Sequence, residues 1–263
     1  MRGIERGNRP SVRGDAMSGT DIQRRLEAFL GQPAVARALR EVQDRLPDGA
    51  AVYLVGGAIR NLAIEAIHGY RPPIKDLDLF IDRVDDERLL SKRLFPEGAE
   101  ITDLGGIRWR PEGCPYELDL CRMKEFVVLA KLKLSPTLEN LLSTLDFTMN
   151  TLVFDLKQHR LLQRNALRDI RQRLVAFNTR VFYTPLAVCY RCLLLRHKTG
   201  FVFSKAVYRF LRREVDIDTL EATRQLLRVR QGKALARQIL NDYDRVCTSR
   251  DYAQYRAGAG VDG

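Results

Sequence analysis

The sequence lacks any apolar run approaching the roughly 18 residues that a membrane-spanning helix needs. Its first 17 residues include several arginines but no following apolar stretch, so we expect no secretory signal. The five cysteines form no disulfide-like framework, which predicts a reducing, cytoplasmic location. Hydrophobic residues nevertheless make up 45% of the 263 residues, and this excludes a disordered or collagen-like chain.

Acidic residues are scarce in the middle of the chain. The whole sequence carries 44 lysines and arginines against 33 acids, a net charge of +11. Residues 157–200 hold ten of those basic residues and a single acid, Asp169, whereas residues 1–156 carry a net charge of −2. A basic helix is often only a solvated surface, but a block this one-sided favours contact with the phosphates of a polyanionic partner.

The spacing of apolar residues alternates between strand-like and helix-like periods in the first half of the chain. It predicts strands at 51–55, 76–81, 107–109 and 116–120, and helices at 20–45, 58–67, 84–94 and 138–143. Residues 148–155 and 160–162 predict a helix followed by strand segments, and the pattern from residue 166 onward is helical. We therefore expect an α+β protein with a small mixed sheet flanked by helices, followed by an all-helical basic neck and C-terminal helices.

These patterns also divide the chain into segments. Residues 1–19 predict a flexible tail, and residues 20–156 predict a head domain that begins with a helix. Residues 157–200 are interpreted as basic neck helices, and residues 201–263 as a C-terminal helical cap.

Two glycines stand between a predicted strand and the helix that follows it. Without Cβ atoms, Gly56 and Gly57 let the backbone approach a ligand, and the amino end of the next helix favours a phosphate. Arg60, one turn into that helix, adds a charged fork. The turn therefore predicts a phosphate site, with tight packing as the alternative.

Two aspartates follow on a predicted strand. Asp76 and Asp78 are two residues apart, so their side chains share one face of the strand. Adjacent carboxylates repel, and a divalent cation removes that cost. Mg²⁺ binds one or two carboxylates together with substrate phosphates, so the pair predicts a Mg²⁺ site, with two ions as the expected number. An exposed strand face with two solvated acids is the alternative.

A third carboxylate is expected on a neighbouring strand. Glu117 and Asp119 alternate with leucines, so either could ligate a metal or assist the nucleophile. Asp119 is our preferred candidate for a catalytic role, although an ordinary half-buried strand would show the same alternation.

Three stretches together resemble a known family. They are GGAIRN at 56–61, KDLDLF at 75–80 and TLENLLSTLDFTMNTLVFD at 137–155. The resemblance is to the head domain of class II tRNA nucleotidyltransferases (CCA-adding enzymes) and bacterial poly(A) polymerases, within the polymerase β-like nucleotidyltransferase superfamily. It extends over about residues 50–200. The family motif GG-x-x-R-D followed by D-x-D is matched at Gly56, Gly57, Arg60, Asp76 and Asp78, with Asn61 in place of the acid.

The resemblance implies an activity and its residues. It implies Mg²⁺-dependent, template-independent transfer of a nucleotide from a nucleoside triphosphate to an RNA 3′-hydroxyl, such as that of a tRNA. Asp76 and Asp78 would hold metal. The implied nucleotide-binding residues are Gly56, Gly57, Arg60, Asp146 and Asn150, the last two from the family's R-R-D-F/L-T-I-N-A-L motif.

The sequence departs from the family at two motifs. The two arginines that precede the motif aspartate are Thr144 and Leu145 here. In the base-reading motif E-D-P-x-R-x-x-R, Thr184 replaces the aspartate and Ala187 the first arginine, while Tyr190 takes the second arginine position with Arg191 one step away. These departures predict that selection of C and then A is lost.

The predicted RNA contact lies in the basic neck. Arg164, Arg168 and Arg171 recur at helical spacing and are expected to form one face toward the RNA backbone. Two other functions remain open: the same chemistry with an acceptor other than RNA, and a catalytically impaired RNA-binding module of the same family.

Overall fold

A seven-stranded mixed sheet is the centre of the head. The computed structural model describes residues 19–84, 99–102, 106–181 and 183–259. The strands run in the order β3-β4-β5-β2-β1-β6-β7, and only the pairing of β2 with β5 is parallel. Their bounds are β1 (Ala51–Val55), β2 (Asp76–Asp82), β3 (Glu100–Ile101), β4 (Ile107–Trp109), β5 (Glu117–Arg122), β6 (Leu152–Asp155) and β7 (Arg160–Gln163).

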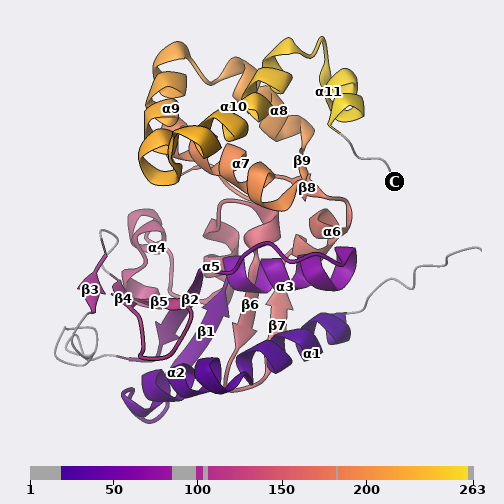
Figure 1. Ribbon diagram of the computed structural model, residues 1–263. Coiled ribbons are helices and arrows are strands. Elements are labelled where there is room, and N and C mark those ends of the chain that lie inside the picture. The colour runs from indigo at the N-terminus through magenta and orange to yellow at the C-terminus, as the bar shows by residue number, and fades with distance from the viewer. Residues whose placement is uncertain (1–18, 85–98, 103–105, 182, 260–263) are drawn as a thin grey trace, which may run out of the picture.

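One face of the sheet is covered by the first three helices, α1 (Gly19–Leu30), α2 (Pro33–Asp44) and α3 (Gly57–His68) (Figure 1). Leu77 and Leu79 of β2 are fully buried in that core. Because strand side chains alternate, the aspartates of β2 point to the opposite face. That face carries a smaller core under α4 (Val127–Leu132) and α5 (Leu138–Thr144), together with the 3₁₀ turn Met123–Glu125.

The C-terminal helices form a layer above the head (Figure 1). A second 3₁₀ turn, Thr148–Asn150, precedes β6. The remaining elements are α6 (Ala166–Arg171), β8 (Leu174–Val175), α7 (Pro185–Thr199), β9 (Val202–Phe203), α8 (Lys205–Arg213), α9 (Ile217–Gln231), α10 (Lys233–Thr248) and α11 (Tyr252–Gly258). One apolar core runs without interruption from the helices of the head into this layer. No described helix has the length and apolar character to cross a membrane.

The predicted fold class is confirmed, since helices flank a mixed sheet and further helices follow it. The single helix expected at 20–45 is wrong, because the chain breaks at Gly31 and Gln32 and restarts with Pro33 at the first position of α2. The predicted tail, except for its last residue, and the predicted helix at 84–94, except for its first, lie outside the described residues.

The segment expected to form neck helices is only partly helical. Residues 160–163 form β7, the edge strand of the main sheet, so the head extends beyond residue 156. Two short parallel strands, β8 and β9, also interrupt the helices of the second half. Each is only two residues long, too short for strand periodicity to predict.

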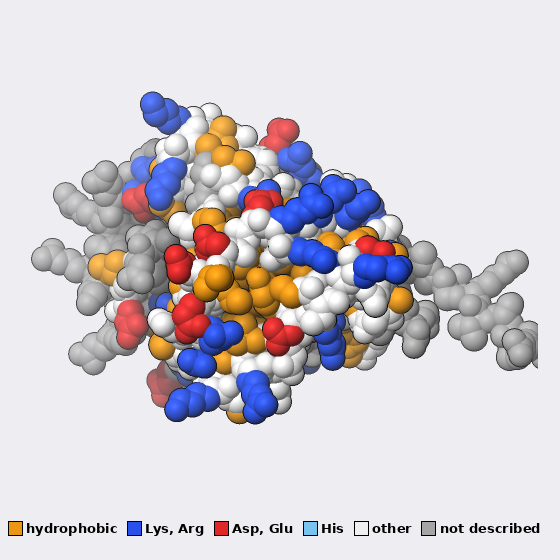
Figure 2. All heavy atoms as spheres, turned by 90° about the horizontal axis from the view of Figure 1, so that it is seen from above, with side chains coloured by type: hydrophobic (Ala, Val, Ile, Leu, Met, Phe, Trp, Pro, Cys, Tyr) orange, Lys and Arg blue, Asp and Glu red, His pale blue; other side chains and the backbone are white. Residues whose placement is uncertain are grey.

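Viewed from above, the helical layer presents many lysine and arginine side chains around a central apolar patch (Figure 2). Acidic side chains are also present on this face, so its positive charge is interspersed with negative charge.

Candidate active site

The glycine turn joins β1 to α3 beside the aspartates. Gly56 has a φ of +72°, a conformation that side-chain-bearing residues rarely adopt, which explains a glycine at this position. A Cβ at Gly56 would lie only 3.8 Å from Asp78 Oδ2, so the turn and the carboxylate are neighbours. The amino end of α3 therefore opens next to an acidic strand.

Strand pairing brings a third acid to the pair. Asp78 of β2 is in register with Asp119 of β5, and Asp76 with Glu117. Burial, followed by repulsion from Asp76 and Asp119, raises the pKa of Asp78 to about 7. The three aspartates thus lie close enough to interact electrostatically, and both burial and this repulsion disfavour the ionised form of Asp78.

Two arginines of the neighbouring strand region neutralise the acids of β5. Arg108 donates from Nε and Nη2 to the two carboxylate oxygens of Asp119, at 2.8 and 2.9 Å. Arg110 donates to Glu117 at 2.6 Å. Both candidates for the third carboxylate are therefore engaged, and Asp119 is the one that lies in register with Asp78.

The oxygen donors suit a magnesium ion that is held jointly by protein and substrate. Within the described residues, no group of three or more carboxylates, imidazoles and thiolates is placed to hold a metal ion. Asp76 and Asp78 offer hard oxygen ligands on one strand face, and Mg²⁺ commonly takes one or two carboxylates plus phosphate oxygens. Burial and then repulsion raise the pKa of Asp78, and such a cation would remove the repulsive part of that cost.

A buried network of hydrogen-bonded side chains connects the glycine turn to the helical layer. Arg60 Nη1 donates to Asn150 Oδ1 at 2.6 Å, and Asn150 Nδ2 donates to Asp146 Oδ1 at 2.9 Å. The other oxygen of Asp146 accepts from Nε of Arg191 on α7. The structure therefore brings together Arg60, Asp146 and Asn150, the three predicted nucleotide-binding side chains, and bonds them to one another.

The carboxylate of Asp146 balances the charge of the two arginines in this hydrogen-bonded network. Burial lowers the pKa of Arg60 to about 10, and attraction by Asp146 opposes that shift most strongly. The same carboxylate raises the pKa of Arg191, whose side chain remains half exposed. Asp146 thus supports two cations, one on each side of it.

Sequence reasoning assigned no role to Arg191, although it noted this arginine one step from a motif position. The position that aligns with the family's arginine is Tyr190, which instead accepts a hydrogen bond from Gln231 of α9 at 3.2 Å. A second missed residue is Lys198, in the last turn of α7, whose pKa is lowered by burial and by repulsion from Arg60. No spacing rule in the sequence could have placed either cation at the site.

The two residues that replace the family's paired arginines supply no charge. Thr144 is buried and donates from its hydroxyl to the carbonyl of Leu141, within its own helix. Leu145 packs against the apolar core beneath α4 and α5. Arg191 is the cation that the structure instead places at Asp146.

The predicted RNA-binding arginines do not share one helical face. Arg164 lies outside α6, because Asn165 adopts a left-handed conformation immediately before that helix. Arg168 is paired with Asp169 at 2.8 Å. Arg168 and Arg171 line a shallow hollow that also contains residues from the start of α1. Their contact with RNA stays a prediction.

Comparison with known proteins supports the fold. No family model and no curated sequence matches the chain. A CCA-adding enzyme solved with ATP superimposes with a TM-score of 0.59 at 16% identity, covering 83% of this chain and 54% of that one. An apo form of a CCA-adding enzyme gives 0.59 at 18% identity, with coverages of 83% and 53%.

A Thermotoga maritima CCA-adding enzyme complexed with tRNA gives a TM-score of 0.59 at 17% identity and covers 85% of this chain and 54% of that one. The chain therefore spans about half the length of these structures. Their fold is the fold of this chain, and the resemblance seen in the sequence motifs is confirmed at that level.

Proposed function

We propose that the protein is a Mg²⁺-dependent nucleotidyltransferase that transfers a nucleoside monophosphate from a nucleoside triphosphate to an RNA 3′-hydroxyl. The observation that carries this proposal is the placement of Asp76 and Asp78 beside the Gly56–Gly57 turn, on a fold shared with CCA-adding enzymes. Those relatives were solved with ATP, CTP or tRNA, which supports a nucleotide and an RNA as partners.

The proposed reaction makes one bond at phosphorus and breaks one. The RNA 3′-hydroxyl gives up its proton to solvent and its oxygen bonds to the α-phosphorus, while the bond from that phosphorus to the bridging oxygen of the β-phosphate breaks and pyrophosphate leaves. Asp76 and Asp78 would hold Mg²⁺, which neutralises charge on the phosphates and favours the attacking alkoxide. The amino end of α3 and the glycine turn would bind the triphosphate, and Arg60 would face its charge.

The proposal is tested by incubating the purified protein with Mg²⁺, each labelled nucleoside triphosphate in turn and total cellular RNA. We expect label in RNA with release of an equal amount of pyrophosphate, and neither in an Asp76→Ala variant. Label in protein or in a small molecule would identify another acceptor. RNA binding without any transfer, in wild type and variant alike, would contradict an enzymatic role and favour an RNA-binding module.

Removing Arg108 is expected to strengthen Mg²⁺ binding. Its two hydrogen bonds hold both oxygens of Asp119, so Arg108→Ala leaves that carboxylate available to the cluster around Asp78. An exposed ion pair contributes up to about 1 kcal/mol. We therefore expect the Mg²⁺ concentration for half-maximal activity to fall by up to about fivefold.

The control for this prediction is Arg110→Ala, which removes the shorter of the two ion pairs of Glu117, in register with Asp76. It leaves Arg108 at 3.8 Å from Glu117 and leaves Asp119 paired. We expect a smaller change in Mg²⁺ requirement for this variant. An Arg108→Ala variant that needs more Mg²⁺ than wild type would show that Arg108 supports the metal site.

A further inference from the structure

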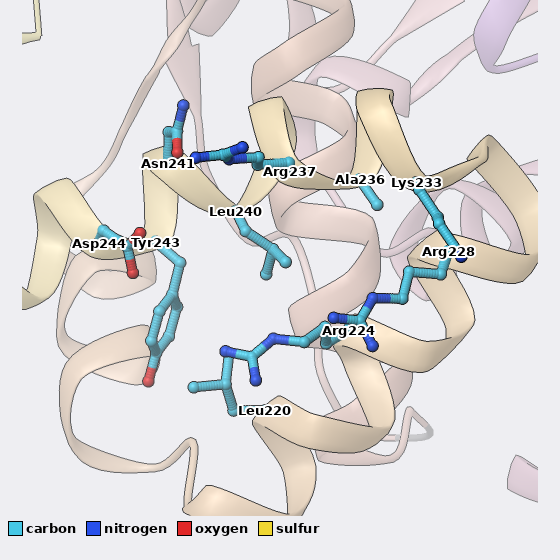
Figure 3. Close-up of a pocket in the computed structure, with 10 residues that line it drawn as sticks. All are labelled: Leu220, Arg224, Arg228, Lys233, Ala236, Arg237, Leu240, Asn241, Tyr243 and Asp244. Carbon is cyan, nitrogen blue, oxygen red and sulfur yellow. The ribbon is translucent and has the colours of Figure 1, made fainter.

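A basic groove lies between α9 and α10, in the helical layer. It has a volume of about 650 Å³. Leu240 of α10 points toward the side of Arg224 and Arg228 on α9, while Arg237 extends along α10 toward Asn241 (Figure 3). Its apolar lining comes from Leu220, Ala236, Leu240 and Tyr243. Asn241 and Asp244 lie at one end, and four cations complete the lining: Arg224, Arg228, Lys233 and Arg237.

The four cations form two rows. Arg224 and Arg228 lie one turn apart on α9, and Lys233 and Arg237 lie one turn apart on α10, a rise of roughly 6 Å in each case. Regularly spaced cations on both walls of a groove suit a partner whose negative charges also repeat along its length. Asp244 is the only acid in the lining.

Most of this charge is uncompensated by the protein. Arg224 is paired with Glu221 at 2.7 Å. Arg228, Lys233 and Arg237 form no ion pair with any residue in the part of the chain that the structure describes. Gly232, the residue before α10, has no side chain to cap the amino end of that helix, and the first turn of α10 contains no acid. Helix and side chains therefore present positive charge together.

The groove and the candidate active site both adjoin α7, because α9 and α10 pack on that helix and Arg191 extends from it. Gln231, at the end of α9 next to the groove, donates to Tyr190 of α7. The next residue on α7 is Arg191, which pairs with Asp146. Asp146 belongs to the buried hydrogen-bonded network that also contains Arg60. An anion in the groove would thus lie on the helix pair that packs directly on α7.

We propose that the groove between α9 and α10 binds the sugar–phosphate backbone of the acceptor RNA. This inference rests on the proposed function for the identity of the polyanion. Arg224, Arg228, Lys233 and Arg237 contact successive phosphates, and the apolar lining packs against the sugars. The contact is independent of sequence, because it involves no base edge.

The proposal is tested by measuring RNA binding without Mg²⁺ or nucleotide, so that the result does not depend on catalysis. The test variant is Arg228→Glu/Arg237→Glu. Its matched control is Arg25→Glu/Arg40→Glu, which changes net charge equally on exposed positions of α1 and α2, at the opposite end of the molecule (Figure 1). The probe is a labelled single-stranded RNA, titrated at several salt concentrations.

We expect the groove variant to bind RNA about 10- to 100-fold more weakly than the control. The slope of log K against log salt should fall by about 1.4, because two phosphate contacts are lost at about 0.7 each. Arg228→Ala/Arg237→Ala should show a smaller loss in the same direction, and its thermal unfolding confirms that the fold is intact. Equal losses in the groove and control variants would overturn the proposal, as would binding unchanged in both.

A competition experiment separates RNA from an acidic protein segment. Polyglutamate of equal total charge should displace the RNA weakly. Displacement as effective as that by unlabelled RNA would assign the groove to an acidic peptide and overturn the proposal. RNA binding is measured without nucleotide, so the two proposals can fail separately. If wild type transfers no nucleotide but the groove variant still loses RNA binding, the groove proposal stands and the proposed enzymatic function is rejected. If wild type transfers nucleotide and the groove variant binds RNA as well as wild type does, the enzymatic function stands and the groove proposal is rejected.

Discussion

Asp78→Asn is expected to abolish nucleotidyl transfer and, at the same time, to stabilise the metal-free protein at pH 8. The rate should fall by about 10³-fold or more, because the variant loses a carboxylate that would hold the cation, whose charge stabilisation amounts to several kcal/mol. The stability should rise because Asn removes a charge that burial and two neighbouring aspartates disfavour. Few substitutions at an ordinary surface acid would change activity and stability in opposite directions.

The direction of the stability change in Asp78→Asn follows from the pKa of Asp78 in the folded and unfolded states. The pKa of Asp78 in the folded protein is about 7, whereas an unfolded aspartate titrates near 3.9. A raised folded pKa contributes stability that is complete below the unfolded value and is lost as the pH rises through the folded value. The variant should therefore match wild type near pH 4 and exceed it at pH 8, by roughly 4 kcal/mol in the free energy of unfolding.

Thermal unfolding with and without Mg²⁺ checks both parts. At pH 8, Mg²⁺ should raise the melting temperature of wild type and leave Asp78→Asn nearly unchanged. Asp82→Asn is the matched control, since Asp82 lies on the same strand but at its other end, in register with Ala51. A less stable Asp78→Asn protein at pH 8 would show that the carboxylate is not under electrostatic repulsion.

Local sequence signals were sufficient for the central part of the site. The alternation of Asp76 and Asp78 with Leu77 and Leu79 fixes which side chains share a face, whatever else the strand contacts. Gly56 ends a strand and begins a helix, and its positive φ follows from that geometry. Both features depend on neighbours within a few residues, so the sequence alone could predict them.

The partners of these residues depend on contacts that are distant in the sequence. Arg108 reaches Asp119 because β4 pairs with β5 in a particular register, and no spacing rule specifies that register. Arg191 reaches Asp146 because α7 packs over the head 45 residues later in the chain. The break at Gly31 was missed for a different reason, since the apolar pattern on both sides of it is helical.

Asp146→Ala is expected to destabilise the protein by about 3–5 kcal/mol, the cost of leaving a buried cation, Arg60, without its main compensating charge. The carboxylate accepts hydrogen bonds from Asn150, from Arg191 and from the backbone N–H of Phe147, all of which lose their acceptor. Arg60 is buried and loses the attraction that most strongly offsets its desolvation. Urea unfolding of the variant measures the loss as a lower midpoint.

The control is Asp155→Ala, which removes a buried aspartate whose carboxylate accepts from the backbone N–H groups of Lys157 and Gln158. That variant loses hydrogen bonds but leaves no buried cation uncompensated, so about 1–3 kcal/mol is expected.

A second substitution separates charge from packing. Arg60→Met in the Asp146→Ala background removes the stranded cation, and part of the lost stability should return. The double variant should therefore be more stable than Asp146→Ala alone. This difference would measure the energetic coupling between Arg60 and Asp146, which Asn150 bridges. Additive losses would mean that Asp146 acts through its hydrogen bonds alone, and that the link between the glycine turn and α7 carries no electrostatic coupling.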